Sequence, residues 1–354
     1  MAFSYYRTIT IDKTKVPNTN QTDFPVLVSG TYSYLETVAN GGEVTNASGY
    51  DIGFYSDSAL TTKLKWETER YIATTGEVVY WVKVPTVSTS VDTVIYMAYG
   101  DAAITTDQSD KVNVWDSGYK GVWHLPDGTT LTANDSTSNG ENGTLVNTPT
   151  VTAGKIGGGA NFVRTSSESI TIDNFTAQMN SITTYTMSTW FKAVTVDSNR
   201  HIIGPRNADA SDAFYMLQLG NTTNVEMRFR NSAGTATTLT ATSAVPTGTW
   251  KYLSLVYDGS NLRAYVDGAQ VTSGAASGSF STTDRTFRIG AGDASPFNYL
   301  SGDIDEARMS LVARSADWNA TEYNNQNSPS TFYTVGSQTT PGGGARTDRM
   351  FFGA

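Results

Sequence analysis

Cysteine is absent from the sequence, which excludes disulfide bonds, thiol catalysis and cysteine-ligated zinc sites. Charged residues are also scarce, at 16%, and the 33 acidic residues outnumber the 24 basic ones, so the formal net charge is −9. Binding to a phosphate backbone requires clustered lysine and arginine, so we expect no nucleic acid partner. The sequence contains no apolar run of ~18 residues, so we expect no membrane span.

What the sequence does contain favours strands over helices. Threonine, serine, asparagine and 32 glycines separate short runs of alternating polar and apolar residues. In the first hundred residues such alternation predicts strands over 6–11 and 78–84. The mostly apolar run 93–99 predicts another strand, and a further one begins just after Pro25. We therefore predict that the first hundred residues form a small all-β domain.

Six motifs, in order along these hundred residues, resemble an uncharacterised bacterial domain family that is often found in front of LamG modules. They are YRTITI at 6–11, TDFPVLV at 22–28, YDIGF at 50–54, LKWE at 64–67, WVKVP at 81–85 and IYMAYG at 95–100. The resemblance implies a small β-sandwich and no established activity.

From residue 121 onward the pattern is again strand, turn, strand. Leu262, Ala264 and Val266 alternate with polar neighbours, and Asp267-Gly268 is the signal of a two-residue hairpin turn. Closely spaced strands of this kind predict a β-sandwich or jelly-roll. Residues 317–325 are the one stretch that predicts a short helix, with Trp318 and Tyr323 packed beneath a sheet.

Seven further motifs resemble the LamG-like, concanavalin-type jelly-roll. They lie at 135–145, 157–162, 185–191, 248–259, 262–268, 289–290 and 300–308. The fold class we expect is therefore all-β, with two β-sandwich domains of which the second is a LamG-like jelly-roll. The expected division is 1–100 for the N-terminal β-sandwich, 101–120 for a connector, 121–337 for the jelly-roll, and 338–354 for a Gly-rich linker with a C-terminal peptide.

The acidic run Asp303, Asp305 and Glu306 is the arrangement most suggestive of catalysis. Strand alternation places Asp303 and Asp305 on one face and Glu306 on the other, so the paired carboxylates of a glycosidase are not formed. We therefore interpret the run as a core strand whose acids hold neighbouring backbone or an arginine, and expect no enzymatic activity. Both histidines, His124 and His201, are expected to be structural.

The loop around Asp135, Asn139 and Asn142 concentrates oxygen donors and glycines, as Ca²⁺ sites do. LamG relatives sometimes hold calcium in similar loops, so calcium is the candidate cofactor. The alternative is an Asx-rich turn that needs no ion, and it is the interpretation the composition favours.

Phe297 and Tyr299 stand between turn residues, where a ring can stay exposed and stack on a sugar or a partner protein. They are the candidate ligand-binding residues, and the alternative is that they anchor the loop in the core. The tryptophans in strand patterns, Trp81, Trp190 and Trp250, are expected in the core.

A short basic and aromatic peptide ends the sequence after the glycines of the linker. Adjacent exposed aromatic rings gain nothing in water, so we expect this peptide to bind a hydrophobic pocket on another copy of the chain or on another protein of the same particle or surface. The alternative is that the rings fold back on their own domain. The residues of this assembly anchor are Arg346, Arg349, Met350, Phe351 and Phe352.

The leading hypothesis for function is a virion surface or appendage protein, a fibre or decoration protein of a phage, with a lectin-like jelly-roll that binds glycans or a partner. It draws on the extracellular character of the modules together with an N-terminus, MAFSYYRTITID, that has no pattern of a secretory signal. A bacterial cell-surface or extracellular adhesion or matrix protein is the alternative, and a jelly-roll glycoside hydrolase is the third reading.

Overall fold

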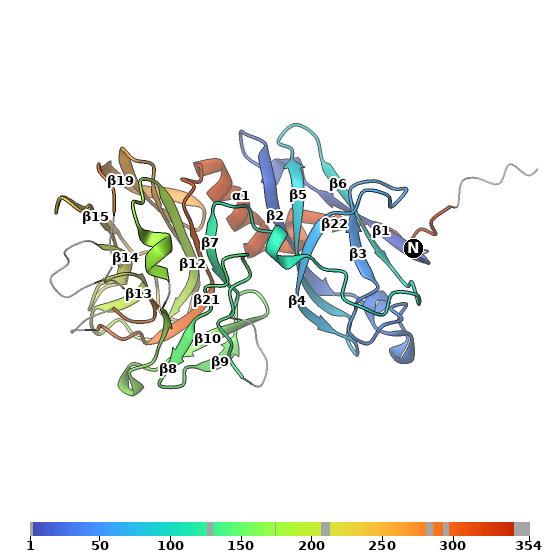
Figure 1. Cartoon of the computed structure of the whole chain (residues 1–354), viewed down its shortest axis with the longest axis horizontal. Helices are drawn as coiled ribbons and strands as arrows, with labels where there is room; N and C mark the ends of the chain where they lie inside the picture. The colour runs from blue at the N-terminus through green and yellow to red at the C-terminus, as the bar shows by residue number, and fades with distance from the viewer. Residues whose placement is uncertain are drawn as a thin grey trace, which may run out of the picture. The chain divides into compact units, whose positions relative to one another are not determined.

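The chain folds into two compact units in the computed structural model, which is shown in Figure 1. Unit 1 contains the described residues up to Lys15, Thr22–Asp110 and the described residues from Pro329 onward, and unit 2 contains Val16–Gln21 and Lys111–Ser328. The structure describes residues 3–125, 130–173, 175–206, 213–280, 286–292 and 297–342.

Unit 1 is a β-sandwich. Its four-stranded sheet has the order β22 (Tyr333–Val335), β1 (Tyr5–Ile11), β6 (Thr93–Tyr99) and β3 (Ile52–Tyr55), and its three-stranded sheet has the order β2 (Gln21–Thr31), β5 (Glu77–Val87) and β4 (Lys65–Ile72). Phe54 of the first sheet packs edge-on against Trp66 and Tyr80 of the second, with ring centroids 5.8 and 5.2 Å apart. The β-sandwich expected for this segment is therefore confirmed.

Two features of unit 1 differ from the sequence-based expectation. Strand β2 starts before Pro25, and it tolerates the missing N–H because it is the edge strand of its sheet. The second domain does not extend to residue 337 as expected, because the described residues from Pro329 onward belong to unit 1. Strand β22 pairs antiparallel with β1 in unit 1, with Ile9 opposite Val335, and the expected connector 101–120 divides between the units after Asp110.

Unit 2 consists of two antiparallel sheets that enclose one core. The eight-stranded sheet contains β19 (Ala269–Ala275), β18 (Asn261–Val266), β17 (Trp250–Tyr257), β12 (Tyr185–Ala193), β21 (Gly302–Ser310), β10 (Gly158–Phe162) and β9 (Thr150–Ala153) in that order, and β7 (Tyr119–Trp123) pairs with β21. The seven-stranded sheet has the order β16 (Ala236–Ala241), β15 (Val225–Arg230), β14 (Ala213–Gln218), β13 (Arg200–Gly204), β20 (Phe287–Ile289), β11 (Ser169–Ile172) and β8 (Thr144–Val146).

The core of unit 2 forms because alternate residues of both sheets point inward. Met187 and Leu255 of the eight-stranded sheet and Phe214 and Met227 of the seven-stranded sheet are all fully buried in the same cluster. An all-β sandwich is therefore confirmed for this unit as well.

Local signals in the sequence place the hairpin and the helix correctly. Asp267 and Gly268 have φ of 50° and 77°, as a primed two-residue turn requires, and they join β18 to β19. Helix α1 (Ala316–Asn327) is capped at its N-terminus by Ser315, whose hydroxyl accepts the N–H of Trp318. Tyr323 of this helix stacks on Trp190 with the ring centroids 5.9 Å apart, as expected for a helix beneath the sheet.

The remaining helical segments are short. They are α2 (Pro329–Phe332) and the 3-10 turns η1 (Lys13–Lys15), η2 (Ser33–Leu35), η3 (Val38–Asn40), η4 (Lys111–Asn113), η5 (Arg164–Ser166) and η6 (Phe175–Met179). Within the described part of the chain, none of the helices has the length and apolar character needed to cross a bilayer.

Two of the three strand tryptophans are core residues as expected. Trp81 and Trp190 are fully buried. Trp250 is only half-buried, because it begins β17 at the margin of the sheet, where the Lys192 ammonium lies 4.9 Å from its ring centroid. The core assignment of Trp250 is therefore wrong.

Candidate functional site

The acidic residues of β21 are occupied by structural contacts. The Asp303 carboxylate pairs with the Lys192 ammonium at 2.6 Å. Asp305 is fully buried, and its Oδ2 accepts the backbone N–H groups of Lys155 and Ile156, each at 2.8 Å. Both carboxylates thus hold neighbouring chain segments, which confirms the interpretation of this run as a core strand.

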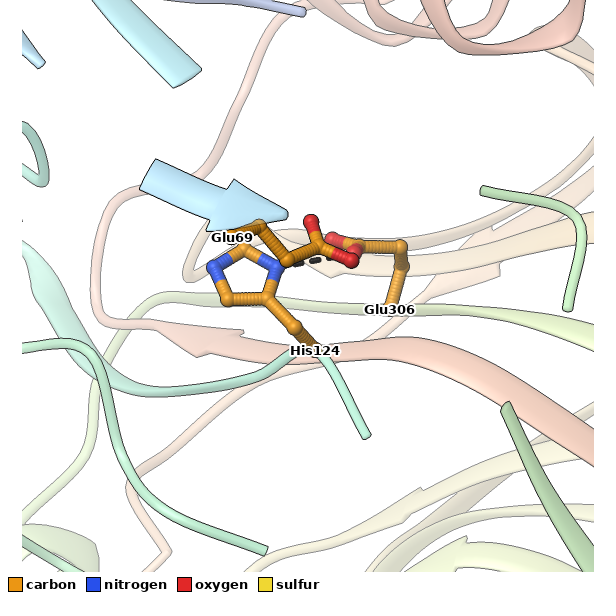
Figure 2. Close-up of side chains that lie close together, drawn as sticks. All are labelled: Glu69, His124 and Glu306. Carbon is orange, nitrogen blue, oxygen red and sulfur yellow. Dashed lines mark hydrogen bonds and ion pairs between the residues drawn. The ribbon is translucent and has the colours of Figure 1, made fainter. Parts of the chain in front are cut away.

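Glu306 joins a buried charge network in unit 2, and Figure 2 shows its carboxylate facing the His124 ring. Nδ1 of His124 lies 2.7 Å from Glu306 Oε1, and Arg308 bonds Glu306 Oε2 and Glu322 Oε1, both at 2.5 Å. Burial by itself lowers the pKa of Arg308, but the two glutamates outweigh it and raise that pKa. His124 is therefore part of a buried charge network, in which the guanidinium of Arg308 stays charged.

The Asp135 loop is held together by its own carboxylate. Asp135 is buried, and its Oδ1 accepts the backbone N–H groups of Val122 and Thr137, both at 2.9 Å. Its Oδ2 accepts the Thr137 hydroxyl at 2.7 Å and the Glu141 N–H at 2.9 Å. Four hydrogen-bond donors therefore face the two carboxylate oxygens.

The two asparagines proposed as calcium ligands with Asp135 have similar roles. Asn142 Oδ1 accepts the N–H of Asp135 at 2.8 Å, and the Asn139 amide group donates to the carbonyl of Tyr119 at 3.1 Å and to the Thr137 hydroxyl at 3.0 Å. The structure brings all three residues together, and the arrangement is that of an Asx-rich turn.

A cleft of about 510 Å³ in unit 2 brings together residues from three distant segments. Arg164 begins η5 after β10, Ser198 and Asn199 precede β13, and Phe297 and Tyr299 precede β21. The two predicted ligand-binding rings are half-buried and line this cleft together.

The rings of Phe297 and Tyr299 form a stacked pair. Their centroids are 5.5 Å apart and their planes are inclined by 26°. Asn298 between them has φ of 49°, a conformation that asparagine tolerates, and its carbonyl accepts the N–H of His201 at 2.8 Å. The loop is thereby tied to β13, and the rings lie at the cleft instead of in the core.

An ion-pair cluster forms the polar side of the cleft. Asp197 bonds Arg200 at 2.5 Å and Arg164 at 3.3 Å, and it accepts the Thr195 hydroxyl at 3.0 Å. The Thr195 hydrogen bond, and then the positive charges of Arg200 and Arg164, lower the pKa of Asp197. The cleft thus offers guanidinium, amide and hydroxyl groups beside an aromatic surface, which is the chemistry needed to bind a polyhydroxylated ring.

Comparison with known families bears on both units. Residues 158–318 match the family described as "Concanavalin A-like lectin/glucanases superfamily". Unit 2 therefore contains a concanavalin A-like domain. Residues 48–124 match a domain of unknown function, DUF2341, as the resemblance of the N-terminal segment implied. No curated protein matches the chain.

Solved structures with similarity to this chain include bacterial binding domains. Domain 4 of AbnA, an extracellular arabinanase of family GH43 from Geobacillus stearothermophilus, solved with arabinotriose, is 20% identical with a TM-score of 0.47, and the match covers 58% of this chain and 98% of that one. The binding domain of Paraclostridial Mosquitocidal Protein 1 is 10% identical with a TM-score of 0.49, and the match covers 58% and 52%. The receptor binding domain of botulinum neurotoxin D is 14% identical with a TM-score of 0.47, with 59% and 53% covered.

Sequence reasoning found the aromatic half of the cleft of the concanavalin A-like domain and missed the polar half. Arg164, Asn199 and Arg200 carry no motif, and they meet Phe297 only because β10, β13 and β21 converge at one end of the sandwich. The anchor residues Arg346, Arg349, Met350, Phe351 and Phe352 lie outside the described residues.

Proposed function

We propose that this chain is a non-catalytic saccharide-binding protein and that a sugar ring binds in the cleft on Phe297 and Tyr299. The observation that carries the proposal is the half-buried, stacked pair of rings at the wall of a cleft that also contains Asn199 and two arginines. An aromatic face packs against the C–H face of a sugar, and neighbouring donors bind its hydroxyl groups.

The distribution of carboxylates supports the non-catalytic part of the proposal. Glycoside hydrolysis requires two carboxyl groups ~5–9.5 Å apart on either side of the substrate. The carboxylate on the polar side of the cleft, Asp197, is ion-paired with Arg200 and Arg164. Asp303, Asp305 and Glu306 are occupied by cations or backbone amides.

The setting of this binding function is a further part of the proposal. A binding module joined to a second β-sandwich suits a protein that attaches one surface to another, and we assign it to the surface of a virion, as an appendage or decoration subunit. A bacterial cell-surface adhesion protein is the alternative. Mass spectrometry of purified particles and of the cell envelope fraction tests this assignment. We expect peptides of this chain in the particles and none in the envelope fraction, and the reverse distribution would favour the alternative.

Binding to a glycan array, followed by calorimetric titration of the best ligand, tests the function itself. Phe297→Ala and Tyr299→Ala should each weaken binding roughly tenfold, because ring packing worth ~0.5–1.5 kcal/mol is lost together with buried apolar area. Tyr50→Ala, which removes a half-buried ring from unit 1, is the matched control and should leave the affinity unchanged. Unchanged affinity in both cleft variants, with melting temperatures like that of the parent, would overturn the proposal.

A further inference from the structure

The outer face of the seven-stranded sheet carries a group of arginines. Along β15, Val225, Met227 and Phe229 point into the core, so Glu226 and Arg228 point outward. Tyr215 on the adjacent strand β14 and Arg288 on β20, two strands further along, lie outward between core residues in the same way. The face therefore has a chemical character of its own, distinct from the apolar inner face.

Strand register places these residues in one row across the sheet. Arg288 is opposite Gly204 of β13, and Tyr215 is opposite Arg228. Gly204 has φ of 114°, and a Cβ atom there would lie 2.3 Å from the carbonyl oxygen of Phe214, so this position excludes a side chain. The row therefore has no side chain at Gly204, which lies between Arg288 on one side and Tyr215, followed by Arg228, on the other.

Arg206 lies close to this gap. Its guanidinium carbon is 5.3 Å from the centroid of the Tyr215 ring. Nε and Nη1 of Arg206, and Nε of both Arg228 and Arg288, are buried from solvent and have no hydrogen-bond partner among the described residues. An unpaired N–H that is removed from water is costly, and an anion would satisfy it.

The arginines of this face have no carboxylate partner among the described residues. In the described chain, neither Arg206 nor Arg228 nor Arg288 forms an ion pair within 4.0 Å of a carboxylate. Arg288 Nη1 donates to the Thr171 hydroxyl at 3.1 Å, and Glu226 on the same face accepts the Tyr215 hydroxyl at 2.7 Å. Among the described residues, these three guanidinium groups thus share the face with the engaged carboxylate of Glu226, on a protein whose net charge is −9.

The arginine row reaches the aromatic cleft. The guanidinium carbon of Arg288 lies 5.9 Å from the centroid of Phe297, and Phe297 also lines the cleft with Arg164 and Arg200. A chain of linked sugars bound at the rings of Phe297 and Tyr299 could therefore extend onto the sheet.

We propose that the saccharide is acidic and that its anionic oxygens bind over Gly204, where they accept N–H groups from Arg206, Arg228 and Arg288. This inference rests on the proposed function, since the neighbouring sugar residue stacks on Phe297. The planar fork of a guanidinium group matches a carboxylate or a sulfate with two parallel hydrogen bonds, so uronic acids and sulfated sugars share the required chemistry.

Titration of the full-length protein with paired ligands tests the inference. Oligogalacturonate is compared with its methyl ester, and dextran sulfate with dextran, so that each pair differs only in the anionic groups. We expect the acidic member of at least one pair to bind at least tenfold more tightly than its neutral partner, with an affinity that falls as salt is added. Preference in the first pair identifies a carboxylate, and preference in the second identifies a sulfate.

Variants connect the preference to the arginine row. Arg206→Gln and Arg228→Gln should each weaken binding of the acidic ligand at least tenfold, and Arg228→Lys should restore part of it. Lys120→Gln removes the same charge from β7 of the eight-stranded sheet and should change the affinity less than twofold.

The possible failures separate the two proposals. Equal affinity for the acidic and neutral members of both pairs, or an acid preference that survives both arginine variants, overturns the acidic-saccharide inference. If a neutral saccharide binds and depends on Phe297 while neither acidic probe does, the proposed function stands and this inference falls. If no saccharide on the array binds at all, both are overturned.

Discussion

Replacement of Asp135 by alanine should destabilise unit 2 strongly and independently of calcium. The substitution removes the buried carboxylate that accepts four hydrogen bonds, two of them from the backbone amides of Val122 and Thr137. Hydrogen bonds to a charged group contribute about 1.5–3 kcal/mol each. The Thr137 hydroxyl can rotate toward another acceptor and the Glu141 amide is only part-buried, so the two fixed amide bonds set the expected loss at about 3–5 kcal/mol.

Calorimetric unfolding in calcium and in a chelator is the assay for this prediction. A domain of this size loses ~2–4 °C of melting temperature per kcal/mol, so the Asp135→Ala transition should fall by roughly 10 °C. Because four donors face the carboxylate, we expect the same fall with calcium and with chelator. Asp173→Ala is the control, since that exposed carboxylate accepts a single long bond of 3.3 Å from Thr144.

Two results would contradict this reasoning about the Asp135 loop. A fall of less than about 1 kcal/mol would mean that water replaces the lost acceptor. A parent protein that melts at a higher temperature in calcium, with an Asp135→Ala variant that no longer responds, would mean that the loop rearranges around an ion.

Three further predictions concern the interior of unit 2. Arg308→Met leaves Glu306 and Glu322 buried without their cation and should lower the free energy of unfolding by about 3–5 kcal/mol in urea denaturation, whereas no loss would show that the network is not formed. Burial, and then the positive charge of the nearby Arg206, lowers the pKa of His201 from 6.5 to about 3. The unfolded chain therefore binds a proton that the folded chain does not, and stability is lost as the pH falls from 6.5 toward 3. Between pH 7 and pH 5 this contributes about 2 kcal/mol, which His201→Gln should abolish; an unchanged pH slope in that variant would refute the assignment. Gly204→Ala puts a side chain at a φ of 114° at the end of β13 and should cost about 1–3 kcal/mol or more, and a variant that melts like the parent would show that this backbone position tolerates a side chain.

The sequence predicted much of the fold because strands and tight turns leave local signals. The mostly apolar run 93–99 matches β6, and Asp267-Gly268 marks the turn between β18 and β19. Strand β22 has only three residues and pairs with a partner at the other end of the chain, so no local pattern could assign it to unit 1.

The candidate site was accessible to sequence reasoning only in part. Phe297 and Tyr299 were identified because aromatic rings among turn residues have no place in a strand pattern. The outward direction of Arg228 can be read from the alternation of β15, but its neighbours depend on strand register. Tyr215 and Arg288 reach the same row through pairings that the sequence does not encode locally.

The central claim, that the concanavalin A-like domain binds a saccharide at one cleft, is tested most directly by a crystal structure of the full chain with the best array ligand. We predict a sugar ring packed on Phe297 and Tyr299, within hydrogen-bonding distance of Asn199 or Arg200. Density for the ligand at another surface of the protein, with the cleft empty, would contradict the claim.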